Sequence, residues 1–211
     1  MFTLYEFASS GNCYKLRLAM AQLGIPFRRI EKDITRGETR TAEFLAINPN
    51  GRIPVLVTPD NRVLPESSAA LWYLARDSKL MPEDPFQQAQ VLQWMFFEQY
   101  NHEPNIATSR YWIHVLGEQE KYAEALAEKQ QKGHDALAVM ETHLSDRDFF
   151  VGRDYSIADI AVWPWISRFD WQTLNLNDYP NVKRWYLDIA ARPAVQTGFH
   201  IPKKVQEIPM P

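Results

Sequence analysis

Residues 48–56, Asn48-Pro49-Asn50-Gly51-Arg52-Ile53-Pro54-Val55-Leu56, combine a chain reversal with the start of an apolar strand. Asparagine and glycine tolerate positive φ and proline fixes its own φ, so the first four residues predict a turn. Proline cannot donate to a sheet ladder, so Pro54 is expected at the beginning of a strand. A cis Ile53–Pro54 bond is expected to direct the Ile53 main chain outward, where it can pair with an extended ligand.

A second motif follows at Pro65-Glu66-Ser67-Ser68, which opens a helical pattern. The N–H groups and the positive dipole end of a helix N-terminus favour a carboxylate by roughly 0.3 to 1 kcal/mol. Ser67 adds a hydroxyl, and Glu66 adds an acceptor for an amine. A ligand with an extended amide, a free carboxylate and a free amine satisfies all of these groups, and glutathione has this outline. The alternative is that Pro54 only edges a sheet and Ser67 only caps a helix.

Strands and helices alternate around these two motifs. Strands are expected at residues 2–7, 27–34, 54–57 and 62–64, and helices at residues 12–23, 41–47 and 66–76. In the first helix, Leu16, Met20 and Leu23 form the expected buried face, with Lys15 and Gln22 outside it. The order β-α-β-α-β-β-α predicts a thioredoxin-like α/β domain.

The polar segment around Pro82 and Pro85 interrupts the helical periodicity, as a linker does. We therefore expect a thioredoxin-like ligand-binding domain at residues 1–77, a linker at 78–86 and an all-α helical domain at 87–211. Within the helical domain, helices are expected at residues 87–117, with a kink at Pro104, and at 121–144, 156–171 and 180–192. Residues 203–211 are predicted to form a loosely held tail.

The composition is that of an ordinary folded protein of 211 residues, with 23 basic and 26 acidic side chains and a formal charge of −3. No long block of one charge is present, so we expect no nucleic-acid partner. Cys13 is the only cysteine, which excludes an intramolecular disulfide and a thiol metal cluster and fits a reducing compartment. We find neither a basic leader nor a run of roughly 18 apolar residues, and therefore expect no membrane partner and a cytoplasmic location.

The turn-proline motif and the Glu66-Ser67 helix start, in this order, closely resemble those of the glutathione S-transferases. The resemblance extends from residue 2 to about residue 199 and implies the same two-domain fold. It also implies contacts for each part of glutathione. The expected contacts are the Ile53 main chain beside Pro54 for the cysteinyl part, Glu66 and Ser67 for the γ-glutamyl amine and carboxylate, and Arg52 and Thr39 for the glycyl end.

The resemblance is to the bacterial type of this family, activated by serine or asparagine and related to the theta and nu-like members. It places Ser10 where serine-type enzymes carry the hydroxyl that activates the thiol, and Asn12 matches an asparagine of bacterial members. We expect Ser10 to stabilise the thiolate, with Asn12 as a second or joint donor; the alternative is that Ser10 only caps the first helix. Cys13 is either a thiol activated by the helix dipole or, more commonly for such a residue, a small buried apolar side chain.

Two patterns in the second half add to the resemblance. Ser156-Ile157-Ala158-Asp159 has the form of a capping box, with Tyr155 as a possible staple, and its expected role is in folding, so Asp159 is not expected to be a catalytic acid. Residues 97–104 resemble bacterial members, and Tyr100, Tyr111 and Trp112 are the expected contacts of the second substrate.

The resemblance implies a detoxifying transferase. The thiolate of glutathione, its co-substrate, would attack a hydrophobic electrophilic small molecule, and no metal would take part. Two alternatives are a glutathione-dependent peroxidase or disulfide reductase and a non-catalytic regulatory protein of the same fold. Family members usually form homodimers, so a twofold dimer is also expected.

Overall fold

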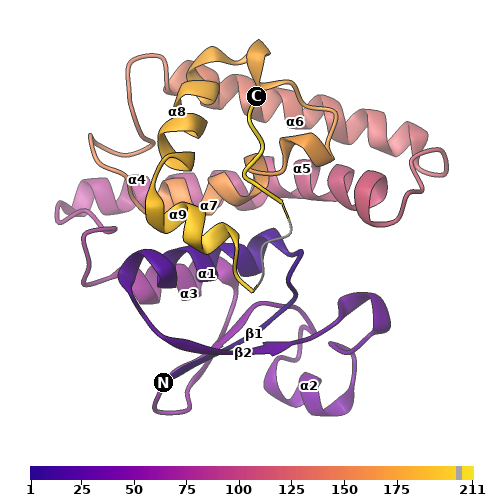
Figure 1. The fold of residues 1–211 in the computed structure, drawn as a ribbon, viewed down its shortest axis with the longest axis vertical. Coiled ribbons are helices and arrows are strands. Elements are labelled where there is room, and N and C mark those ends of the chain that lie inside the picture. The colour runs from indigo at the N-terminus through magenta and orange to yellow at the C-terminus, as the bar shows by residue number, and fades with distance from the viewer. Residues whose placement is uncertain (203–205) are drawn as a thin grey trace. The chain divides into compact units, whose positions relative to one another are not determined.

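The computed structural model describes residues 1–202 and 206–211. The chain divides into two compact units, each of which is described by itself (Figure 1). The first unit comprises Met1–Ser78 together with Pro193–Val205, of which residues 193–202 are described, and the second comprises Lys79–Arg192 with Gln206–Pro211. The division near residue 78 lies at the expected linker. The expected helical domain at 87–211 differs from the structure, because the segment that begins at Pro193 belongs to the first unit.

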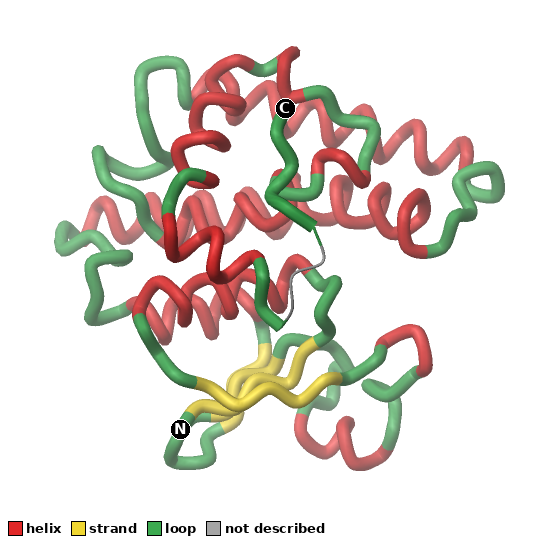
Figure 2. The backbone as a smooth tube through the Cα atoms, viewed as in Figure 1, coloured by secondary structure: helices red, strands yellow, loops and turns green. Residues whose placement is uncertain are grey.

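The first unit contains a four-stranded sheet of order β2-β1-β3-β4, drawn in yellow in Figure 2. The strands are β1 Phe2–Glu6, β2 Phe27–Glu31, β3 Val55–Val57 and β4 Val63–Pro65. β1 and β2 are parallel, whereas β3 pairs antiparallel with both β1 and β4. The predicted order of elements is confirmed. β2 is shorter than predicted, because a 3₁₀ turn at Ile34–Arg36 follows it, with Asp33 accepting the Thr35 N–H at 2.8 Å.

Four helices accompany this sheet: α1 Gly11–Leu23, α2 Ala42–Ile47, α3 Ser67–Ala75 and α9 Pro193–Phe199. α1 and α3 lie together on one face of the sheet (Figure 1). α9, which the sequence did not predict, packs against α1, and a Cβ added at Gly198 would lie 3.1 Å from Leu18 Cδ1. The rings of Tyr14 and Phe199 meet edge to face at 5.8 Å in the same contact.

Lys15 contradicts the expected orientation of α1, because its side chain is 0% exposed instead of lying outside the buried face. Leu16 and Met20 are buried, as predicted, but so are the other residues of the helix from Cys13 to Met20. α1 is therefore buried around most of its circumference, since α3 and α9 both pack on it.

The second unit is helical: α4 Pro85–Phe97, α5 Glu103–Arg110, α6 Ala123–His143, α7 Ile157–Ile166 and α8 Pro180–Ala190. Two π-helical turns, Glu98–His102 and Tyr111–Val115, stand before and after α5. The π-helical turn Glu98–His102 lies directly before Pro104, where the sequence predicts a kink. No helix in residues 1–202 or 206–211 has the length and apolar character needed to cross a membrane.

The predicted capping box at the start of α7 is confirmed. Ser156 Oγ accepts the Ala158 N–H at 3.2 Å, and Asp159 Oδ2 accepts the Ser156 N–H at 2.9 Å. Asp159 Oδ1 also accepts the Phe150 N–H at 3.2 Å and the Trp185 Nε1–H at 2.9 Å. Burial raises the pKa of Asp159 to about 6. These contacts of the carboxyl group are all structural, which agrees with its predicted role.

The described part of the predicted tail contacts the second unit. Tyr186 Oη donates a 2.6 Å hydrogen bond to the Pro209 carbonyl, and Gln206 Nε2 donates to Asp170 Oδ2 at 3.1 Å. Residues 206–211 are therefore held more closely than the polar sequence predicted. The remainder of the predicted tail, residues 203–205, lies outside the described residues.

Candidate functional site

Ser10 stands at the N-cap of α1, at the end of the loop that follows β1. Its Oγ accepts the Cys13 N–H at 3.3 Å, and its own N–H donates to the Phe7 carbonyl at 3.0 Å. The capping role that was one of the two alternatives is therefore observed. A serine hydroxyl that accepts one hydrogen bond keeps its own proton for donation. The half-buried Ser10 can therefore cap α1 and donate to a ligand at the same time.

Cys13, in the first turn of α1, is buried. The Phe7 N–H points to its Sγ at 3.5 Å, and burial raises the pKa of the thiol to about 12. Because the thiolate is the nucleophile, this thiol is protonated and inaccessible near neutral pH. Of the two alternatives for Cys13, the structure has the small buried side chain.

Asn12 and Ser67 approach each other from the first turns of α1 and α3. Ser67 Oγ donates to Asn12 Oδ1 at 3.2 Å, and Lys15 Nζ donates to Ser67 Oγ at 3.5 Å. Ser67 is 5% exposed and Lys15 is 0% exposed, whereas Asn12 is half-buried. Two residues proposed from the sequence for different parts of the ligand are thus in direct contact. Lys15 was missed, because a lysine next to an apolar stripe was assigned to the solvent side of the helix.

Four charged side chains hold the loop that carries Ser10. Glu6 is 0% exposed and pairs with both Arg17 and Arg29, and Arg29 Nη2 also lies 2.8 Å from Glu31 Oε2. Arg17 Nη2 donates to the Ala8 carbonyl at 2.8 Å, and the Ala8 N–H donates to Glu31 Oε1 at 2.9 Å. Both polar groups of the Ala8 main chain are thus bonded to this network, which positions the loop between β1 and α1.

The predicted turn at residues 48–51 is held by its own side chains. Asn48 Oδ1 accepts the Asn50 N–H at 3.1 Å, and Asn48 Nδ2 donates to the Arg52 carbonyl at 2.8 Å. Gly51 has a φ of +60°, and an added Cβ would lie 2.9 Å from the Thr39 carbonyl oxygen, so glycine is required here. The turn therefore brings buried Thr39 and exposed Arg52 to its two sides.

The Ile53–Pro54 peptide bond that follows the turn is cis. Ile53 is half-buried, and none of the hydrogen bonds among the described residues engages its main chain. Glu66, which immediately precedes α3, is exposed and has φ +69° and ψ +115°, a conformation that is rare for a residue with a side chain. Such strained positions occur most often at ligand sites. The start of α3 therefore presents exposed Glu66 next to buried Ser67.

The three aromatic residues expected to contact the second substrate differ in their exposure. Tyr100 is 83% exposed, whereas Tyr111 and Trp112 are half-buried in the next π-helical turn. Trp112 stacks on Tyr122, with ring centroids 4.5 Å apart. His102, in contrast, is 0% exposed within the helical unit, so it is not an accessible acid or base there.

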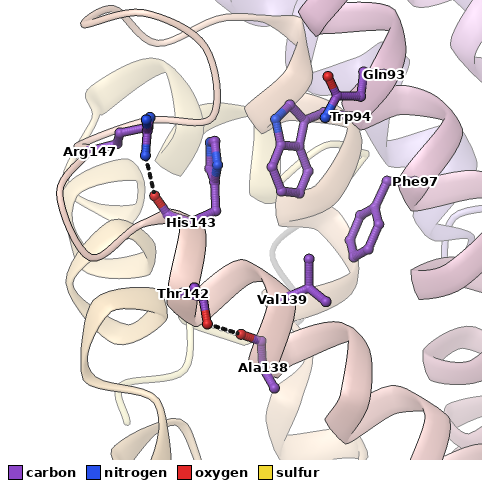
Figure 3. Close-up of a pocket in the computed structure, with 8 residues that line it drawn as sticks. All are labelled: Gln93, Trp94, Phe97, Ala138, Val139, Thr142, His143 and Arg147. Atoms are coloured by element: carbon purple, nitrogen blue, oxygen red, sulfur yellow. Dashed lines mark hydrogen bonds between the residues drawn. The ribbon is translucent and has the colours of Figure 1, made fainter.

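A groove of about 690 Å³ lies between α4 and α6 of the helical unit (Figure 3). It is lined by Gln93, Trp94, Phe97, Ala138, Val139, Thr142, His143 and Arg147. Figure 3 shows Trp94 and Phe97 facing it from α4 and Val139 from α6, so its walls are mainly apolar. None of the three predicted aromatic contacts lines this groove.

Arg110 is a second basic residue that the sequence did not single out. Its side chain lies in the helical unit at 6% exposure, with the guanidinium carbon 5.8 Å from the Trp165 ring and 5.5 Å from the Trp171 ring. Burial, and then the charge of Arg168, lower the pKa of Arg110 to about 10. The indole faces contribute electrostatic attraction in place of an ion pair.

Comparisons with known proteins give matches over most of the chain. A family model described as "Glutathione S-transferase, N-terminal domain" matches residues 9–77, and one described as "Glutathione S-transferase, C-terminal domain" matches residues 94–193. Among curated proteins, the disulfide-bond oxidoreductase YfcG of Escherichia coli (strain K12) is 32% identical over 201 residues, which cover 92% of each chain.

Among solved structures, two bacterial transferases share the fold. A glutathione S-transferase from Pseudomonas fluorescens is 41% identical with a TM-score of 0.89, over 92% of this chain and 96% of that chain. A glutathione transferase from Burkholderia graminis, solved with two glutathione molecules bound per subunit, is 28% identical with a TM-score of 0.84, over 96% of this chain and 89% of that chain. The two family models together match more than half of the sequence, and the chain therefore belongs to the glutathione S-transferase family.

Proposed function

We propose that this protein binds glutathione in its first unit and uses the bound thiolate to attack an electrophilic carbon of a small hydrophobic molecule. The observation that carries the proposal is the contact between Asn12 and Ser67, 3.2 Å apart at the first turns of two helices. Helix N-termini and their hydroxyl and amide side chains favour anions. A thiolate and a carboxylate of one ligand have complementary donors here.

The proposed contacts follow the order of groups along glutathione. Glu66 accepts from the γ-glutamyl amine, and the main-chain N–H of Ser67 at the start of α3 donates to the γ-glutamyl carboxylate, while the unengaged main chain of Ile53 pairs with the cysteinyl amide beside Pro54. Arg52 and Thr39, on the two sides of the Gly51 turn, are the candidates for the glycyl end, with exposed Arg52 able to reach furthest into solvent.

Ser10 and Asn12 are the proposed donors to the sulfur, as in the serine- or asparagine-activated bacterial type. Lowering the thiol pKa by two units takes about 2.7 kcal/mol of preferential stabilisation of the thiolate. A hydrogen bond to a charged group contributes roughly 1.5 to 3 kcal/mol, so two such donors are sufficient. Cys13 cannot take the nucleophile's part, since its buried thiol has a pKa of about 12.

The alternative acceptor is a disulfide, and the similarity to a disulfide-bond oxidoreductase favours it. The glutathione thiolate would attack one sulfur, forming a mixed disulfide and releasing the other sulfur as a thiolate. A second glutathione would then release the remaining thiol and form glutathione disulfide. The relative from Burkholderia graminis, solved with two glutathione molecules per subunit, offers a precedent for a site of that size.

Both proposals require glutathione to bind as a thiolate. This step is tested by titrating glutathione into the protein at neutral pH and following thiolate absorbance in the ultraviolet. We expect a saturable signal that is reduced in Ser10→Ala or Asn12→Ala. Turnover of chlorodinitrobenzene and of hydroxyethyl disulfide by the same preparation then separates conjugation from disulfide reduction. Saturable binding without thiolate would instead favour the non-catalytic regulatory protein.

A twofold homodimer is part of the same proposal. α4 exposes Leu92 at 37% and Phe96 at 69%, and the adjoining π-helical turn exposes Tyr100 at 83%. Large apolar side chains gathered on one helix are typical of a protein interface. Solution scattering that gives the mass of a single 24.6 kDa chain would contradict the dimer.

A further inference from the structure

Lys15 is a buried cation in contact with Ser67 of the proposed glutathione site. It is 0% exposed, and its Nζ lies 3.5 Å from Ser67 Oγ, which in turn lies 3.2 Å from Asn12 Oδ1. A lysine is almost never fully buried unless its charge is used. The three side chains form a chain of hydrogen bonds that starts at an ammonium group and ends at the amide proposed to face the sulfur.

We propose that Lys15 is a positioning residue that orients the Asn12 amide, through Ser67, so that its N–H group faces the glutathione thiolate. This inference rests on the proposed function, because it assigns a role to Lys15 in that same site. Lys15 is not proposed to touch the sulfur. Lys15 acts by fixing the direction in which the Ser67 hydroxyl and the Asn12 amide donate their hydrogen bonds.

The direction of the chain follows from the donors and acceptors available. An ammonium group has three donors and no acceptor, so Ser67 Oγ accepts from Lys15. The single hydroxyl proton of Ser67 is then directed to Asn12, and Asn12 meets it with its carbonyl oxygen. The two polar atoms of an amide point in different directions, so Nδ2 is turned away from Ser67 and presents donors elsewhere.

Removing the ammonium group removes this constraint. Ser67 Oγ could then accept from Asn12 Nδ2, which would reverse the amide and turn Oδ1 toward the sulfur. A carbonyl oxygen repels a thiolate, so the thiol would hold its proton more tightly. The expected consequence is a rise in the pKa of the bound thiol, on the order of one unit or a tenfold loss of thiolate at pH well below that pKa.

A purely structural role makes a different prediction. In that case Lys15 only fills space between α1 and α3, and its removal lowers the melting temperature while leaving the thiol pKa unchanged. A direct effect of the charge on the sulfur makes a third prediction, since it does not require Asn12. The pKa of the bound thiol and its dependence on Asn12 therefore separate the three roles.

The experiment uses the full chain and glutathione itself as the probe. Lys15→Met keeps the length of the side chain without the charge, and Lys15→Gln keeps a polar end that can both donate and accept. The second variant carries the test if the first does not fold.

Thiolate absorbance as a function of pH gives the pKa of the bound thiol, calorimetry gives glutathione affinity, and thermal unfolding gives stability. The same substitutions are repeated in an Asn12→Ala background, with half-buried Lys32→Met as the matched control.

We expect the Lys15 variants to bind glutathione with a thiol pKa raised by about one unit, and to add no further rise once Asn12 is alanine. An unchanged pKa with lowered stability, or an equal rise in the Asn12→Ala background, would overturn the positioning role while leaving the proposed function intact. Native protein that binds no glutathione, or binds it without thiolate, would overturn both proposals together.

Discussion

The Ser10 hydroxyl oxygen accepts the Cys13 amide hydrogen at 3.3 Å, which makes the residue proposed to activate glutathione the N-cap of α1 as well. The two roles use different parts of one hydroxyl group, since the cap uses a lone pair and activation uses the proton. The capping bond also fixes where Oγ stands. The capping bond therefore positions Ser10 Oγ and leaves its hydroxyl proton available for the ligand.

Substitutions at Ser10 separate these roles. Ser10→Ala loses both, and we expect a decrease of about 0.5 to 2 kcal/mol in the free energy of unfolding together with loss of thiolate. Ser10→Asp keeps a strong N-cap acceptor but has no proton to donate at neutral pH, so stability should be retained while the thiolate signal falls. Urea unfolding and thiolate absorbance are the two measurements. Native thiolate formation in Ser10→Asp would leave Asn12 as the sole activator.

Arg17 holds both the buried Glu6 carboxylate and the Ala8 carbonyl. Arg17→Met leaves Glu6 with Arg29 alone, and removing one partner of a buried pair typically costs about 3 to 5 kcal/mol. We expect a loss of that order in urea unfolding, partly recovered in Arg17→Met combined with Glu6→Gln. The control is Lys132→Met, which breaks the exposed pair of Lys132 with Glu128 and should change stability by less than about 1 kcal/mol. Equal effects of the two methionine variants would contradict the proposed support of the loop.

Asp159 gives the protein a distinct dependence of stability on pH. Burial raises its folded pKa to about 6 from the ordinary 3.8, so the folded state binds this proton more tightly than the unfolded state does. The resulting stability is fully present below about pH 4 and is lost as the pH rises through about 6, a change on the order of 3 kcal/mol. Urea unfolding of the native chain and of Asp159→Asn between pH 4 and 7 isolates the contribution. The difference between the two curves should change across this range, and a constant difference would show that the hydrogen bonds to the Asp159 carboxylate offset the effect of burial.

Cys13 should be inert toward thiol reagents in the folded protein. Its pKa of about 12 and its burial both prevent thiolate formation, so labelling by a chromogenic disulfide at pH 8 should proceed only as fast as the first unit opens. Labelling rates measured with increasing urea test this expectation. Cys13→Ala should keep disulfide reductase activity if that activity is present, because the nucleophile is the glutathione sulfur. Loss of activity in a folded Cys13→Ala variant would contradict the proposed chemistry.

Local patterns and long-range packing explain which features could be predicted from the sequence. The turn at residues 48–51 and the capping box at Ser156 depend on neighbours within four residues, and both were predicted. The burial of Lys15 depends on Ser67, which lies 52 residues away, and no helical periodicity contains that information. The contact of Gly198 with Leu18 spans nearly the whole chain, and for the same reason α9 was not predicted to join the first unit.

Arg110 provides a test of how a buried cation is stabilised without an ion pair. Among the described residues no carboxylate lies within ion-pair distance of its guanidinium, and its Nε has no hydrogen-bond partner. The two indole contacts contribute about 0.5 to 1 kcal/mol each, whereas desolvation of a charge costs several kcal/mol. Arg110→Met keeps the apolar contact with Trp165 and Trp171 and removes the charge, so we expect the free energy of unfolding to rise by about 1 kcal/mol.

Urea unfolding measures the change, and the control is half-exposed Arg147→Met, which should be nearly neutral. A clear loss of stability in Arg110→Met would show that the attraction to the indole faces outweighs the cost of burying the guanidinium.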